Sequence, residues 1–202
     1  MSGYQDFVSI FGSGKFIYSN EISKGYSFQK ALTSLYIIPT FFRGIYYIPT
    51  NRERKGHFIE NKQEFFSSLF NKHYGRNSWY WGLSTAARYY GIEWSATKIL
   101  EIVTTQKSKT INFSEKIMSL KNKKSYRSIT LAKFYNSLDV NIIFIHKGQK
   151  ESLSSIKIDD TMGPICNIQQ LQKDIERFSS KIRYSELKKI YTRISNSLKN
   201  HN

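Results

Sequence analysis

The sequence has 202 residues, of which 40% are hydrophobic and 15% aromatic, so it carries enough apolar mass for a folded core and is not typical of a disordered chain. Thirty-one Lys and Arg residues face 15 Asp and Glu, which gives a formal net charge of +16. A charge of this size favours a polyanionic partner. We place nucleic acid ahead of anionic lipid, and ahead of a lysine-rich surface that serves solubility alone.

Membrane attachment is not expected, because no apolar run approaches the roughly 20 residues that a spanning helix needs. The richest stretch, 36–49, is interrupted by Pro39, Arg43 and Gly44. The N-terminus lacks the basic start and apolar core of a signal peptide. Cys166 is the single cysteine, which excludes an intrachain disulfide and suits a reducing compartment. We therefore expect a cytoplasmic protein.

The first fifty residues predict a series of short elements. The first is a helix over 4–11 that Gly12 ends, followed by an extended segment over 16–19. Next comes a short helix over 21–24, which Ser19 or Asn20 caps and Gly25 ends. A helix over 26–36 and a two-stranded ribbon over 37–48, which Pro49 closes, complete the series. A helix, a tight turn, a second amphipathic helix and a β-ribbon are the parts of a winged helix-turn-helix, which we predict for residues 1–50.

The helix over 26–36 has two different faces. Apolar residues recur at helical spacing on the face expected to be buried: Phe28, Ala31, Leu32 and Leu35. The opposite face carries side chains suited to base edges and phosphates in the major groove of DNA: Tyr26, Gln29, Lys30, Thr33 and Ser34. At the ribbon tip we expect Arg43 to enter the minor groove or bind a phosphate, while Gly44 supplies the positive φ of a tight turn. The plainer interpretation is an ordinary amphipathic helix and hairpin.

Residues 51–62 are highly charged and are predicted to form a basic linker between two domains. Its cations would add affinity for DNA that depends on salt and not on base sequence: Arg52, Arg54, Lys55 and Lys62. The remaining residues, 63–202, are expected to form a larger mixed α/β domain. The predicted fold class is therefore α+β, with an N-terminal winged helix-turn-helix followed by a larger domain that ends in two helices.

Within residues 63–202 the periodicity predicts both helices and strands. The expected elements are a helix over 63–70, a helix over 79–90 between a cap at Asn77-Ser78 and Gly91, strands over 98–105, 109–113 and 140–146, and helices over 165–179 and 185–199. The first two strands are expected to pair across a basic turn, and 114–138 is assigned no element. Trp79-Tyr80-Trp81 is interpreted as core rather than as a surface for stacking bases.

No group of residues predicts catalysis. The four histidines, at 57, 73, 146 and 201, are scattered and offer no metal-ligand spacing, and we interpret His146 and Cys166 as packed residues. Glu53-x-Lys55 matches half of a nuclease motif outside any strand. Asp159-Asp160 is typical of a cap or loop, and residues 12–14 lack the strand, spacing and lysine of a phosphate-binding loop. We predict no catalytic residue, no metal and no cofactor.

Several segments resemble a known family and follow its order. FFRGIYYIP (41–49) resembles the wing of AbiEi-type antitoxins of type IV toxin–antitoxin systems, which typically ends in an Arg-Gly-aliphatic-Tyr element. SWYWGLSTAARYYGI (78–92) is similar to the family's helix with an aromatic start, Ser-Ala middle and Tyr-Gly end, and ILEIVTTQKSKTINF (99–113) is similar to its strand, basic turn and strand. KIRYSELKKIYTRI (181–194) matches the C-terminal helices more weakly. Residues 158–166 keep little of the Glu-Arg-Thr…Asp stretch that many members carry.

The resemblance implies a transcriptional repressor and an antitoxin. It implies an N-terminal winged helix-turn-helix that binds double-stranded DNA at repeated operator sites in the protein's own promoter, where several copies would assemble. It also implies a C-terminal α/β domain for antitoxicity. The implied partner is a nucleotidyltransferase-like toxin, which the antitoxin counters without a stable complex.

Two other interpretations stay open. A nuclease targeted by a winged-helix domain would need acids clustered in space, and loss of activity on Asp159→Ala or Glu101→Ala would support it. An RNA-binding module would use exposed aromatic residues and the Lys-rich segment 121–127 (KNKKSYR).

Overall fold

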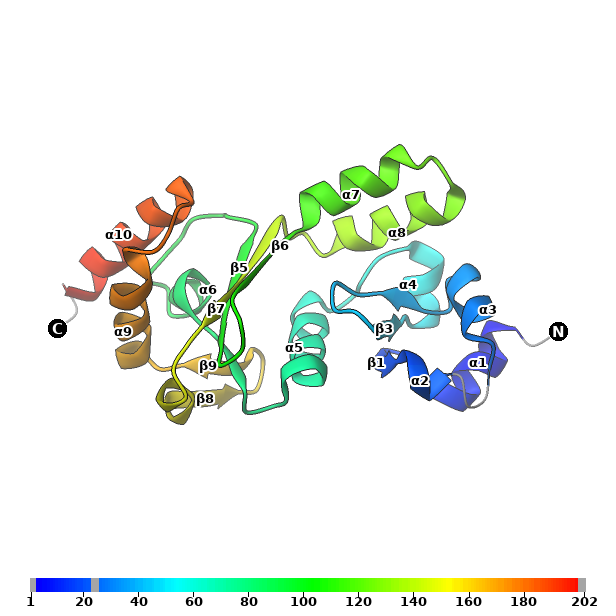
Figure 1. Ribbon diagram of the computed structural model, residues 1–202, viewed down its shortest axis with the longest axis horizontal. Helices are drawn as coiled ribbons and strands as arrows, with labels where there is room; N and C mark the ends of the chain where they lie inside the picture. The colour runs from blue at the N-terminus through cyan, green and yellow to red at the C-terminus, as the bar shows by residue number, and fades with distance from the viewer. Residues whose placement is uncertain (1–2, 23–25, 200–202) are drawn as a thin grey trace. The chain divides into compact units, whose positions relative to one another are not determined.

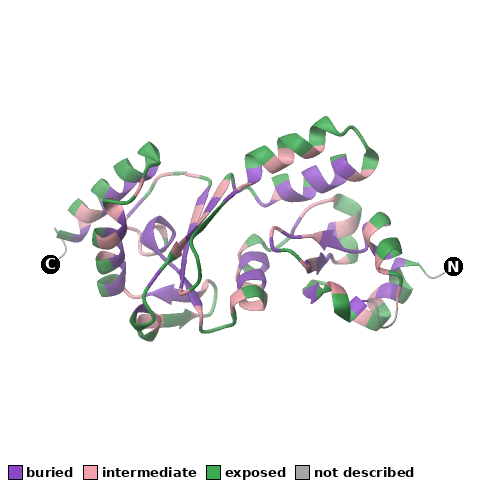
Figure 2. Cartoon of the chain, viewed as in Figure 1, coloured by how far each residue is buried: buried purple, intermediate pink, exposed green. Residues whose placement is uncertain are grey.

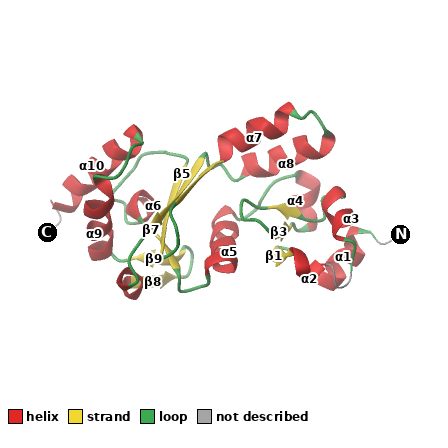
Figure 3. Ribbon diagram, viewed as in Figure 1, coloured by secondary structure: helices red, strands yellow, loops and turns green. Residues whose placement is uncertain are grey.

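The computed structural model describes residues 3–22 and 26–199, which fold into a mixture of helices and strands (Figures 1 and 3). The predicted α+β class is confirmed. The chain packs as two compact units: Met1–His73 with Phe113–Asp139, and Tyr74–Asn112 with Val140–Asn202. This division differs from the predicted boundaries at 50 and 62. The reason is that Phe113–Asp139, far along the chain, packs with the first unit.

The first unit is built on a three-stranded antiparallel sheet in the order β1-β3-β2. Its elements are α1 (Tyr4–Phe11), β1 (Lys15–Tyr18), α2 (Ser19–Ile22), α3 (Phe28–Thr33), β2 (Ile38–Pro39), β3 (Ile45–Ile48), α4 (Asn51–Gly56), α5 (Lys62–Tyr74), α7 (Phe113–Asn122) and α8 (Tyr126–Ser137). The boundary between the units falls within α5, whose last residue, Tyr74, is assigned to the second unit. The last two helices fill the stretch 114–138 to which the sequence analysis assigned no element.

Apolar side chains from α1, α2, α3, the connection after α3 and the sheet form the core of the N-terminal elements: Tyr4, Phe7, Ile17, Ile22, Ala31, Tyr36, Ile37 and Ile48. The helices α7 and α8 pack against the edge strand β2. The Tyr135 hydroxyl donates to the Pro39 carbonyl (2.5 Å), and the Lys116 ammonium donates to the Thr40 carbonyl (3.5 Å). These two bonds link α8 to β2 and α7 to Thr40, the residue that follows β2.

Two N-terminal elements differ in their bounds from the predicted ones. The helix predicted over 26–36 is the shorter α3, because the Ser27 hydroxyl accepts a hydrogen bond from the Lys30 amide (3.3 Å) and caps the helix there. At the other end, Leu35 takes a φ of 54°, which ends the helical path. The short helix α2 begins at Ser19, two residues before the predicted start. Gly25, which was expected to end it, lies outside the described residues.

The segment predicted as a linker, 51–62, contains helix α4. The Thr50 hydroxyl accepts from the Glu53 amide (3.2 Å), and the Glu53 carboxylate accepts from the Thr50 amide (2.7 Å). This reciprocal pair is a capping box, which satisfies two backbone donors that have no partner inside the helix. The Thr-x-x-Glu spacing was visible in the sequence, but the high charge of the segment concealed it.

The second unit is built on a six-stranded mixed sheet in the order β6-β7-β5-β4-β9-β8. Its elements are β4 (Trp79–Trp81), α6 (Leu83–Tyr89), β5 (Ile99–Thr104), β6 (Lys109–Asn112), β7 (Ile142–Lys147), the 3₁₀ helix η1 (Glu151–Ser155), β8 (Ile156–Asp159), β9 (Gly163–Cys166), α9 (Ile168–Ser179) and α10 (Ser185–Lys199). The pairs β5–β7 and β4–β9 are parallel, and the other neighbours are antiparallel.

Three predictions for this unit were wrong. Residues 79–81 form strand β4 rather than the start of a helix, because they pair with β5 and β9 and because Gly82 separates them from α6. A Cβ at Gly82 would lie 2.9 Å from a Val103 methyl carbon. The strands β5 and β6, expected to pair, are separated by β7. Residues 165–166 belong to strand β9, so the helix predicted from 165 begins at Ile168.

The buried residues of α9 and α10 lie on one side of each helix (Figure 2). On α10 they keep the predicted helical spacing: Leu187, Ile190, Tyr191, Ile194 and Leu198. The predicted pair of C-terminal helices is therefore confirmed. Over the described parts of the chain, no helix combines the length and the apolar character needed to span a membrane.

Candidate nucleic-acid interface

Helix α3 separates its apolar and polar residues as predicted. Ala31 is wholly buried, and Leu35, just beyond the helix, is 7% exposed. Phe28 and Leu32 are half-buried and pack against the same core. On the opposite side, Gln29, Lys30 and Thr33 are exposed. The helix therefore presents an amide, an ammonium group and a hydroxyl to solvent from one face.

The other two residues predicted on this face are less accessible. Tyr26 is half-buried, and its ring packs edge-on against Phe7 with 5.1 Å between centroids. The Lys30 ammonium lies 5.5 Å from the centre of the same ring. Ser34 is half-buried at the C-terminal end of α3. The Thr33 hydroxyl donates to the Gln29 carbonyl (2.9 Å), so its proton serves the helix and its oxygen is left to accept.

Arg43 stands exposed at the tip of the hairpin between β2 and β3. The Ile45 amide donates to the Phe42 carbonyl (3.3 Å) and closes a tight turn, in which Gly44 takes a φ of 81°. The Gly44 carbonyl in turn accepts from the Ser19 amide (3.0 Å) at the start of α2. The backbone that carries Arg43 is thus fixed on two sides, while its guanidinium extends into solvent.

The basic residues of α4 differ in their surroundings. Arg52 forms an ion pair with Glu60 (3.0 Å). The Arg54 guanidinium lies over the rings of Tyr4 and Tyr36, 4.8 and 5.3 Å from their centroids. Lys55 is exposed.

A groove of about 400 Å³ joins residues that the sequence analysis treated separately. It is lined by the end of α3, by α4 and by α8: Thr33, Ser34, Leu35, Arg54, Lys55, His57, Tyr126, Thr130 and Phe134. Figure 1 shows α3 and α8 on either side of α4. Four of these nine lining residues are predicted DNA-binding residues: Thr33, Ser34, Arg54 and Lys55. Arg43, at the hairpin tip, is not among them.

Tyr126 lines the groove and was not among the predicted DNA-binding residues. It is 75% exposed at the start of α8, which follows Lys121 at the end of α7 and the connection that contains Lys123 and Lys124. The cluster KNKKSYR was its signal in the sequence, and it was assigned only to an RNA-binding alternative. Its place beside α3 could not be anticipated, because residues 34–125 separate the two ends in the chain.

The groove is electropositive. His57, in left-handed conformation (φ 57°), lines it, and the pKa of His57 is lowered by burial and by the charges of Lys133 and Arg54. The imidazole of His57 therefore loses its proton more readily than a free histidine does. A phosphate would be attracted to such a groove, and the exposed Tyr126 hydroxyl could donate to its oxygens.

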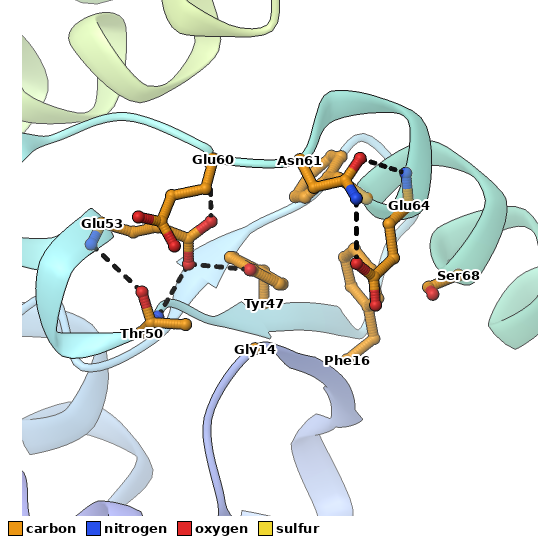
Figure 4. Close-up of a pocket in the computed structure, with 10 residues that line it drawn as sticks. Gly14, Phe16, Tyr47, Thr50, Glu53, Glu60, Asn61, Glu64 and Ser68 are labelled. Carbon is orange, nitrogen blue, oxygen red and sulfur yellow. Dashed lines mark hydrogen bonds between the residues drawn. The ribbon is translucent and has the colours of Figure 1, made fainter. Parts of the chain in front are cut away.

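Carboxylates line a different, smaller pocket of about 200 Å³ in the first unit (Figure 4). Glu53 accepts from Tyr47, from the Thr50 amide and from the Glu60 amide, while Glu64 accepts from Asn61. Glu53 and Glu64 thus accept hydrogen bonds from the backbone and from neighbouring side chains. Within the described residues, no three His, Cys, Asp or Glu side chains are grouped so as to hold a metal ion.

Other residues considered in the sequence for base stacking, metal binding or catalysis lie in the second unit. Trp79, Tyr80 and Trp81 are wholly buried, as their interpretation as core requires. Asp159 accepts from the Thr161 and Met162 amides, and Cys166 is buried, which raises the pKa of its thiol. His201 lies outside the described residues.

The chain matches no protein-family model, no curated protein and no solved structure.

Proposed function

We propose that this protein is a DNA-binding transcriptional regulator whose first unit contains a winged helix-turn-helix. The observation that carries the proposal is the exposure of Gln29, Lys30 and Thr33 on one face of α3, whose other face is fixed in the core through Ala31. A major groove admits an α-helix, and glutamine and lysine pair with adenine and guanine edges there. In this proposal α3 reads base pairs.

The flanking residues would supply affinity. Arg43 at the hairpin tip acts as the wing residue, and the groove with Arg54, Lys55 and Tyr126 receives a phosphate of the same duplex. Phosphate contacts of this kind position a protein on DNA without reading its sequence. The formal charge of +16 supports a polyanionic partner in general.

The biological role rests on the resemblance to AbiEi-type antitoxins. On that basis we propose a cytoplasmic autorepressor that binds its own promoter and counters a nucleotidyltransferase-like toxin without a stable complex. The test is co-expression with the product of a neighbouring toxin gene. Growth should be rescued by the full chain and by a Lys30→Ala variant, because antitoxicity is assigned to the second unit. A toxin that is neutralised only by variants that bind DNA would contradict this division of labour.

Lys30→Ala and Arg43→Ala are expected to weaken promoter binding in different ways. Loss of a base contact by Lys30→Ala should cost about 1–3 kcal/mol on the operator and little on random DNA. Loss of a phosphate contact by Arg43→Ala should weaken binding to every duplex and reduce the salt slope, d log K/d log[salt], by about 1. Fluorescence anisotropy with labelled promoter DNA, titrated over salt with random duplex as competitor, measures both.

Two exposed cations of the second unit provide matched controls. Lys173→Ala and Arg76→Ala remove the same charges and should leave the affinity and the salt slope near those of the wild type. Equal losses in all four variants would mean that net charge alone drives binding, and the assignment of α3 would fall. Single-stranded RNA of the same length is included, and its binding ahead of the duplex would favour the RNA-binding alternative.

A phosphate in the groove should change the titration of His57. Burial, Lys133 and Arg54 hold the pKa of His57 below its ordinary value, and a neighbouring phosphate would favour the protonated ring. The pKa of His57 is therefore expected to rise on binding operator DNA. NMR titration of its Cε1–H resonance, with and without operator DNA, measures the shift. An unchanged His57 in the complex would place the phosphates elsewhere.

A further inference from the structure

Glu101, in the middle of β5, is the centre of a buried hydrogen-bond network in the second unit. Its side chain is wholly buried, and its two carboxylate oxygens accept four hydrogen bonds. Oε2 accepts from the Ser84 amide (3.0 Å) and hydroxyl (2.5 Å), and Oε1 accepts from His146 Nε2 (2.9 Å) and the Tyr191 hydroxyl (2.6 Å). The network ties together α6, β5, β7 and α10, and it fixes the imidazole of His146.

The fixed imidazole lines a pocket. Because Nε2 is hydrogen-bonded to the Glu101 carboxylate, the second ring nitrogen of His146, Nδ1, is left to form a hydrogen bond with a ligand. The ring packs against Phe178 with 4.9 Å between centroids, and Phe144 is its neighbour on the same face of β7 at 6.2 Å. Its side chain is 14% exposed, so a ligand in the pocket can reach it.

The pocket has a volume of about 450 Å³, which is within the range of small-molecule sites. Its wall is formed by aromatic and aliphatic side chains from β7, α9 and α10. Its rim carries Lys181 and Arg183 from the connection between the two helices, and both are exposed. No carboxylate within the described part of the chain pairs with either cation. Tyr184, 40% exposed, lies 5.7 Å from Phe144 between ring centroids.

We propose that this pocket binds a nucleoside monophosphate. The base would stack on one of the Phe144 and Tyr184 rings and contact the edge of the other, the phosphate would bind Lys181 and Arg183, and His146 Nδ1 would form a hydrogen bond with the base or ribose. The site belongs to the second unit and does not rest on DNA binding by the first.

The composition of the pocket favours this ligand class over a fatty acid or a bare anion. Stacking on aromatic side chains contributes to the binding of every base, because each has a π-face. Arginine matches the geometry of a phosphate with paired N–H donors. A fatty acid would form no hydrogen bond with the imidazole that lines the pocket, and a bare phosphate would make no contact with the aromatic wall.

Calorimetric titration of the full chain with AMP, GMP, CMP and UMP tests the proposal. At least one of the four should bind about tenfold more tightly than its own nucleoside and than inorganic phosphate, because both halves of the ligand make contacts. Absence of binding by all four at millimolar concentration would overturn the proposal. Inorganic phosphate binding as tightly as the nucleotide would overturn the role of the aromatic wall.

Paired surface variants locate the site. Lys181→Ala/Arg183→Ala should weaken nucleotide binding by about tenfold or more, whereas Lys188→Ala/Lys189→Ala, with the same loss of charge on the exposed side of α10, should not. Tyr184→Ala should weaken the nucleotide and leave inorganic phosphate unchanged. All three variants alter exposed positions, and an unchanged melting temperature confirms that they fold. Equal weakening by the two double variants would show that general charge attraction, and not a specific site, holds the nucleotide. The Lys30→Ala variant of the first unit should bind the nucleotide as the wild type does.

Discussion

Replacement of Glu101 by alanine is expected to lower the free energy of unfolding of the second unit by about 3–5 kcal/mol. The change leaves the Ser84 hydroxyl, His146 and Tyr191 buried or half-buried without their acceptor, and it opens a cavity in the centre of the sheet. Urea unfolding followed by tryptophan fluorescence measures the loss. The signal is specific, because Trp79, Trp81 and Trp94 are the three tryptophans of the chain and all belong to the second unit.

The contribution of Glu101 should also depend on pH. Burial raises the pKa of Glu101, but the hydrogen bonds from His146, Ser84 and Tyr191 outweigh it and hold the pKa below the ordinary 4.5. A depressed folded pKa contributes stability that is present above the unfolded pKa and is lost as the pH falls through the folded value. The wild type should therefore lose part of its stability below about pH 4.5, and Glu101→Gln should lack that part.

Asp174 provides a matched control in the same unit. It accepts from the Tyr80 hydroxyl (2.7 Å) and the Gln170 amide (2.8 Å), yet burial prevails and raises its pKa. A raised carboxyl pKa means that the fold favours the protonated acid, so stability falls as the pH rises through that pKa. Asp174→Asn should cost no more than about 1 kcal/mol at neutral pH. Equal losses for Glu101→Gln and Asp174→Asn would contradict the distinct role of Glu101.

Elements with a strong local pattern were predictable from the sequence. Strand β7 has a continuous apolar run, α10 has apolar residues at helical spacing, and the hairpin tip carries Arg43-Gly44 between β-branched and aromatic residues. Each of these signals lies within a few positions along the chain. The same holds for the exposed face of α3, which is set by the position of Ala31 and its apolar neighbours.

Features that depend on distant partners were not predictable in this way. Residues 79–81 have the spacing of a helix, and only pairing with β5 and β9 makes them a strand. Helices α7 and α8 pack against each other and are linked by hydrogen bonds to Pro39 and Thr40, far away in sequence. The contact between Glu101 and His146 joins residues 45 positions apart and arises from the parallel pairing of β5 and β7. From the sequence, Glu101 was interpreted as a possible nuclease acid and His146 as a packed histidine.

Glu53 gives the corresponding prediction for the first unit. Its side chain, in a residue only 2% exposed, joins β3 to α4: it accepts from the Tyr47 hydroxyl (2.8 Å) and from the amides of Thr50 (2.7 Å) and Glu60 (3.0 Å), as Figure 4 shows. Glu53→Ala removes the acceptor of all three donors and the capping box of α4. We expect a loss of about 3 kcal/mol in the free energy of unfolding of this unit.

Hydrogen exchange measured by mass spectrometry separates the two units in this experiment. Exchange should accelerate in peptides from β3 and α4 and remain unchanged in β5 and β7. Glu60→Ala is the matched control, since Glu60 is exposed and its ion pair with Arg52 should contribute less than about 1 kcal/mol. DNA affinity should fall in Glu53→Ala alone, because α4 positions Lys55 and Arg54 in the groove beside α3. A Glu53→Ala protein with wild-type exchange but altered activity on nucleic acid would instead favour the nuclease motif Glu53-x-Lys55.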